Sequence, residues 1–270
     1  MKFSLKLKQN KNALVSLALS LAGFAFLWLV WVVAYYAVKN EFLFPSVGDT
    51  FSALGKLLFT GGELARAFWR SLGTTFLRTF LAFLISLAGG VGLAALSVSF
   101  RGVRAFLAPV VSVLRTIPTL AIVIFLLLWT SPSFAPVLVS VLVLLPAVYA
   151  SALTCFSDAV TRFSEFARAY KIGRAKRIFG LYLPVSLPAL LTEGGATLAM
   201  GLKITVSGEV LSSTFRSLGG MMQEAQIYLE TPRLFALTLI VVLLGFLLEG
   251  GCALLRRLLV KWNTAGERAV

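Results

Sequence analysis

The sequence predicts an all-α membrane protein with six transmembrane helices. Of its 270 residues, 59% are hydrophobic and only 13% are charged, which is too apolar for a soluble domain of this length. Long runs without any charge are separated by short basic connections. Because an apolar run of about 20 residues is long enough to cross a bilayer as a helix, these runs indicate a polytopic protein.

The basic residues are concentrated in alternate connections. Sixteen of the 25 Lys and Arg lie in the N-terminus, residues 101–104, the 158–188 segment and the C-terminal tail. The positive-inside rule therefore predicts that these four segments and both termini are cytoplasmic. The net charge of +14 does not indicate nucleic-acid binding, because no continuous basic face interleaved with aromatics is present.

The spans follow in order from the charge-free runs. The first, Ala13–Val38, follows a cytoplasmic N-terminus at 1–12 and is longer than the apolar region of a signal peptide. The stretch from Thr116 to Ser157 is long enough for two crossings, and Ser131-Pro132-Ser133 is the expected break between them. The predicted spans are 13–38, 75–98, 106–129, 136–156, 188–211 and 234–255, followed by a cytoplasmic tail at 256–270.

Small residues in the second span indicate close helix packing. Gly89-Gly90-x-Gly92 would let a neighbouring backbone approach, since packing rather than hydrophobicity drives helix association in lipid.

The loop at 158–187 is the one long charged segment between two very apolar ones. The loop contains six basic residues and only two acidic ones, Asp158 and Glu165. Apolar residues recur at helical spacing from Val160 to Tyr170. We expect two short amphipathic helices, joined near Gly173, on the membrane face. The six basic residues are Arg162, Arg168, Lys171, Arg174, Lys176 and Arg177.

This loop resembles the coupling loop of binding-protein-dependent ABC importer permeases. Glu165 and Ala167 match the Glu-Ala-Ala start of that loop, and Leu183-Pro184 matches its Leu-Pro end in register. Phe166 replaces the first Ala, Lys171 occupies the usual glycine position, and Leu181 replaces Ile. The resemblance implies a type I importer permease fold and assigns ATPase coupling to Arg162, Glu165, Phe166, Ala167, Arg168, Lys171, Gly173, Leu183 and Pro184.

Other segments resemble the nitrate, sulfonate and taurine branch of these permeases. They are FPSVGDTFSALGKLL, Ser71-Leu72 with Arg78, and LRTIPTLA. The resemblance implies a small, often anionic or zwitterionic solute and a location in the bacterial inner membrane. It also implies three kinds of protein partner: a second permease copy, giving a homodimer, two cytoplasmic ATP-binding subunits, and an extracytoplasmic solute-binding protein. The solute itself cannot be read from these residues.

The chain carries no sign of its own catalytic chemistry. It has no phosphate-binding loop, no dinucleotide fingerprint and no histidine. Cys155 and Cys252 both lie in apolar segments, so neither a disulfide framework nor a metal site is expected. We therefore expect a non-enzyme without cofactors, in which a separate subunit hydrolyses ATP.

Ionisable residues inside spans are candidates for the substrate pathway, because a charge in hydrocarbon is costly. Arg115 precedes Pro118, which should kink the third span, and Lys203 and Glu209 lie in the fifth. Lys203 could neutralise an anionic substrate, or it could form a buried ion pair with a carboxylate such as Glu209. Arg115 could likewise pair between helices. Glu165 in the loop could contact the ATPase or make a hydrogen bond within the loop.

Two other functional classes remain open at this point. An ATP-independent secondary transporter or channel would be supported by two similar halves, and the sequence shows none. A membrane-embedded enzyme would require clustered His, Asp or Glu at span ends, whereas the acids here are scattered.

Overall fold

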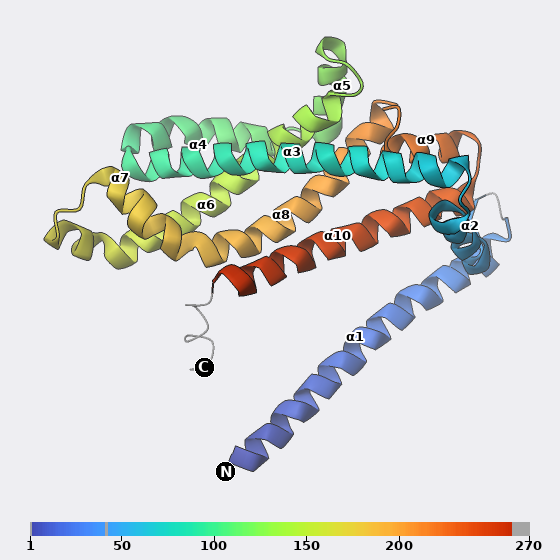
Figure 1. Ribbon diagram of the computed structural model, residues 1–270, viewed down its shortest axis with the longest axis horizontal. Coiled ribbons are helices and arrows are strands. Elements are labelled where there is room, and N and C mark those ends of the chain that lie inside the picture. Colours follow the sequence, from blue (N-terminus) through green and yellow to red (C-terminus); the bar gives the residue numbers. More distant parts are fainter. Residues whose placement is uncertain (1, 41–42, 261–270) are drawn as a thin grey trace.

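The computed structural model describes residues 2–40 and 43–260, and all regular structure within them is helical (Figure 1). In chain order the helices are α1 (Lys2–Val38), α2 (Val47–Phe59), α3 (Glu63–Ser99), α4 (Arg101–Thr116), α5 (Thr119–Trp129), α6 (Ala135–Ala169), α7 (Arg174–Arg177), the π-helical turn η1 (Ile178–Tyr182), α8 (Leu183–Leu211), α9 (Leu218–Ile227) and α10 (Thr231–Leu259).

The number of possible crossings agrees with the predicted fold class. Five segments are each long and apolar enough to cross a membrane: part of α1, all of α3, α6 and α10, and the continuous run Ala175–Leu211. The bent pair α4–α5 makes six if it is counted as one crossing. The membrane boundaries on these helices, and the cytoplasmic tail, remain predictions, and residues 261–270 of that tail lie outside the described residues.

The third crossing is broken rather than kinked. We expected one helix over 106–129 with a bend at Pro118, but α4 and α5 meet at 96°. Ile117 adopts an extended backbone (φ −69°, ψ 127°). The cause is local, because proline lacks an N–H and disfavours helical geometry in the residue before it.

Four long helices form the body of the bundle, in which α3 packs along α6, α6 along α8, and α8 along α10 (Figure 1). A Cβ atom added at Gly90 would lie 2.9 Å from the backbone nitrogen of Tyr149, so α3 and α6 touch backbone to backbone there. The predicted close packing is confirmed at Gly90, whereas a Cβ atom on Gly92 would meet open space.

The two ends of the bundle differ. At one end, which we call the hairpin end, residues 170–182 connect α6 to α8, and Tyr149, Phe156 and Tyr182 form a buried cluster. We call the other end the α9 end. There, α2, α9 and the start of α10 pack over Phe68 and Leu202. Helix α1 diverges from the bundle (Figure 1) and touches it through Trp31, which donates to Pro45 O (3.2 Å) and packs on Phe235.

Candidate functional site

The turn at the hairpin end has a defined geometry. Helix α6 ends with two paired bonds, Ile172 N–H to Ala167 O and Lys171 N–H to Arg168 O, both 3.0 Å. This is a Schellman termination, in which the residue after the cap is left-handed and is usually glycine. Here that residue is Lys171, with φ of +49°. The position where the coupling loop usually carries glycine is therefore one where the backbone favours glycine.

The predicted pair of amphipathic helices is present, but neither helix is separate. The first is the end of α6, which extends to Ala169, and the second, α7 with η1, runs directly into α8. Pro184 has no backbone N–H to donate. The N–H of the preceding residue, Leu183, donates to Ile178 O, five residues back, which is the π-helical pattern of η1. The side chain of Tyr182 below this turn is 6% exposed. The hairpin is thus built from the ends of two long helices and is continuous with both.

The outer surface of the hairpin combines aromatic and charged side chains. Glu165, Arg162 and Arg168 are exposed, and the rings of Phe166 and Tyr170 pack together with centroids 4.6 Å apart while both stay exposed. Within the described part of the chain, no ion pair joins Glu165 to either arginine. Exposed aromatic and arginine side chains are typical of protein–protein interfaces.

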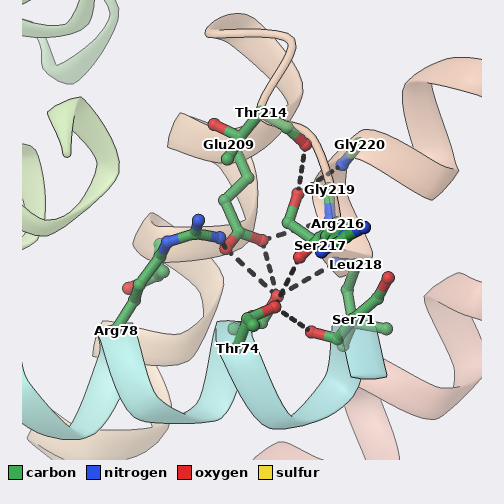
Figure 2. Close-up of polar contacts among 12 residues, drawn as sticks. Ser71, Thr74, Arg78, Glu209, Thr214, Arg216, Ser217, Leu218, Gly219 and Gly220 are labelled. Carbon is green, nitrogen blue, oxygen red and sulfur yellow. Dashed lines mark hydrogen bonds and ion pairs between the residues drawn. The ribbon is translucent and has the colours of Figure 1, made fainter. Parts of the chain in front are cut away.

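A buried charged cluster lies at the α9 end (Figure 2). The carboxylate of Glu209, 0% exposed, accepts bonds from Thr75 Oγ1 (2.8 Å), Arg78 Nη1 (2.9 Å) and the Gly219 N–H (3.2 Å). The Thr75 hydroxyl in turn accepts from the Leu218 N–H (2.9 Å). One carboxylate therefore joins α3, α8 and the start of α9.

Two glycines allow this junction to close. A Cβ atom at Gly219 would lie 2.5 Å from both Val206 O and Glu209 Cβ, and one at Gly220 would lie 2.2 Å from Thr214 O. A larger residue at Gly219 would push the start of α9 away from α8, and one at Gly220 would clash with the connection between them, so the Gly-Gly pair is a packing requirement here.

The predicted pathway residues do not converge. Glu209 pairs with Arg78 and not with Lys203, which is exposed on α8. Arg115 and Pro118 are exposed at the α4–α5 break. Sequence reasoning did not predict the partnership of Thr75 and Arg78 with Glu209, although Arg78 was part of a recognised motif.

Lys203 belongs to an exposed stripe along α8. The stripe follows helical spacing and opposes the face that packs on α6 and α10; its members are Glu193, Ala196, Met200, Lys203, Ser207 and Leu211. No ion pair within the described residues involves Lys203 or Glu193. The described residues contain no group of three His, Cys, Asp or Glu side chains arranged to hold a metal.

Comparison with known proteins gives a consistent result. The family described as "binding-protein-dependent transport system inner membrane component" matches residues 86–261. The taurine transport system permease protein TauC of Escherichia coli (strain K12) is 28% identical over 250 residues, covering 91% of this chain and 90% of TauC. SsuC of Bacillus subtilis (strain 168), a permease protein whose name assigns it to aliphatic sulfonates, is 28% identical over 215 residues, 78% of this chain and 75% of SsuC.

The fold has a counterpart among solved structures. A chain of the MetNI methionine ABC transporter in an inward-facing conformation superposes with a TM-score of 0.57 at 20% identity, covering 72% of this chain and 94% of that one. Together with the six possible crossings and the hairpin, the family match places this chain among the permease subunits of binding-protein-dependent importers, a family of multi-pass membrane transport components rather than enzymes.

Proposed function

We propose that this permease imports a small anionic or zwitterionic solute of the sulfonate or taurine type. It would do so as a homodimer, with two cytoplasmic ATP-binding subunits at the hairpin end and a solute-binding protein at the α9 end. The names of the relatives support the solute class. The distribution of basic residues supports the orientation, with the hairpin and both termini in the cytoplasm.

The exposed α8 stripe is the observation that supports a solute path. Lys203 lies eight residues, about 12 Å, from the end of α8 at Leu211. A charge at that depth is not stable facing lipid, so it faces protein or a water-filled cavity. Because Lys203 makes no ion pair within the described chain, the stripe is suited to line a path shared with the second permease copy.

The hairpin is suited to connect ATP hydrolysis to this path. Its exposed surface, centred on Glu165 and Phe166, would contact the ATP-binding subunit. The hairpin is continuous with α6 and α8, and Ser186 Oγ donates to Cys155 O (3.1 Å) to tie those helices together near its base. A movement of the hairpin would therefore turn α8 and its exposed stripe as a rigid body.

The proposal is tested by the variant Lys203→Met in proteoliposomes that hold the full complex and receive loaded binding protein. Because Lys203 makes no ion pair with any described residue, we expect normal assembly and normal basal ATPase activity but at least tenfold slower uptake. Lys56→Met, an exposed lysine on α2, is the matched control and should transport normally. Unchanged uptake in Lys203→Met would remove this residue from the path, and a tagged chain that purifies without any ATP-binding subunit would overturn the importer proposal.

A further inference from the structure

A cleft opens at the α9 end, outside the buried Glu209 cluster. Its volume is about 390 Å³, and α3, the α8–α9 connection, α9 and the start of α10 form its walls. Three arginines, Arg70, Arg216 and Arg233, line it, against one carboxylate, Glu224. The volume falls in the range of small-molecule sites, which is about 300–1,000 Å³.

Only one of these arginines is neutralised. Arg233 bonds to Glu224 at 2.9 Å and to Glu230 at 3.0 Å. Neither Arg70 nor Arg216 has a carboxylate within ion-pair distance in the described part of the chain. The guanidinium of Arg216 instead lies over the Phe215 ring, 5.3 Å from its centroid. Two guanidinium groups, the preferred partners of planar or tetrahedral oxyanions, are therefore left without a counter-charge in one cleft.

The backbone that carries Arg216 is held in place. Its φ of +52° lies in the left-handed region, which is unfavourable for a side chain of this size. The Thr74 hydroxyl donates to Arg216 O (Figure 2). The neighbouring Thr214 hydroxyl donates to Pro132 O (2.8 Å). The bundle thus fixes the direction in which the Arg216 side chain leaves the chain, while the guanidinium itself has no carboxylate partner among the described residues.

We infer that this cleft binds the sulfonate or carboxylate group of the solute through Arg70 and Arg216, before the solute enters the path along α8. The inference rests on the proposed function, which places the α9 end outside the cell and gives the solute an anionic head group. The cleft supplies what such a head group lacks once it leaves water and its binding protein, namely two positively charged hydrogen-bond donors close to the entrance.

The test uses trifluoromethanesulfonate as probe and the complete permease–ATPase complex in nanodiscs. Fluorine NMR line broadening of the probe measures its affinity without ATP, binding protein or transport; empty nanodiscs and neutral trifluoroethanol serve as blanks. We expect saturable binding that weakens at least tenfold in Arg70→Gln/Arg216→Gln. Arg66→Gln removes an exposed arginine one turn away on α3 that does not line the cleft, and it should bind the probe as the parent does.

Uptake of taurine and association with the binding protein are measured on the same variants. Arginine-dependent probe binding without ATP-driven uptake of any anionic or zwitterionic solute would leave the site standing and remove the proposed function. Normal uptake with no arginine-dependent probe binding would leave the proposed function standing and overturn the solute site in the cleft. If the probe does not bind but the double variant loses affinity for the binding protein, the cleft holds an acidic side chain of that protein, and the solute site is overturned. An equal loss of probe affinity in Arg66→Gln would also overturn the solute site, because the binding would then depend on the general positive charge of this end rather than on Arg70 and Arg216.

Discussion

Replacing Glu209 by alanine should destabilise the subunit far more than the same change at Glu224. Both carboxylates bond to an arginine at 2.9 Å, but Glu209 is 0% exposed and Glu224 is 51% exposed. Glu209→Ala leaves the guanidinium of Arg78, only 16% exposed, without its counter-charge, and the Gly219 N–H without an acceptor. Removing one partner of a buried pair costs about 3–5 kcal/mol, which is about 10²- to 10⁴-fold in the folding equilibrium.

The matched change is expected to cost little. In Glu224→Ala, Arg233 keeps Glu230 as a partner at 3.0 Å. Exposed pairs contribute about 0–1 kcal/mol. The two changes therefore compare a buried carboxylate, whose loss leaves its arginine without a counter-charge, with an exposed carboxylate whose arginine keeps another partner.

Reversible unfolding by SDS in mixed micelles measures both variants, together with Arg78→Ala and the double variant Arg78→Ala/Glu209→Ala. Because the two residues act as one unit, the double variant should cost less than the sum of the single variants, by on the order of 2 kcal/mol. Equal costs for Glu209→Ala and Glu224→Ala, or strict additivity in the double variant, would refute the reasoning from burial.

Three further predictions concern packing and backbone. Lys171→Gly should raise stability by up to about 1 kcal/mol, because glycine adopts the left-handed turn at the end of α6 without strain; a lower melting temperature would contradict that account. Gly219→Ala should prevent normal assembly, since its Cβ would lie 2.5 Å from Val206 O, whereas Gly250→Ala, where a Cβ meets nothing within 4 Å, should behave like the parent in size-exclusion chromatography. Tyr182→Ala should destabilise the subunit by about 3–5 kcal/mol by emptying the cluster below the hairpin, while Phe179→Ala, a 70% exposed side chain, should leave the unfolding midpoint nearly unchanged.

Several features were accessible to sequence reasoning because their causes are local. The break at 131–133 follows from a Ser-Pro-Ser run, and the structure ends α5 at Trp129 and begins α6 at Ala135. The close approach at Gly90 follows from small residues in an apolar span. The bend at Pro118 was expected, but its size was not. A missing N–H predicts a defect in the helix, whereas the 96° angle depends on how α5 packs against α6 and α8.

The pairing of charges was not accessible in this way. Arg78 and Glu209 are 131 residues apart, and nothing along the chain selects Arg78 as the partner of Glu209. That choice depends on which faces of α3 and α8 pack together. The same limit applies to Arg70, on α3, and Arg216, in the α8–α9 connection, which share a cleft only after folding.

By itself, the amino-acid sequence determined that this chain is a bundle of membrane helices joined by short connections, some of them basic. Lipid requires every backbone group to be bonded within its own segment, so the length and polarity of each segment are sufficient to specify a crossing. Only the tertiary structure decided which charges are neutralised inside the subunit and which remain available, at Lys203 and in the α9-end cleft. Charges act over a few ångströms, and those distances are set by contacts between helices that are remote in the chain.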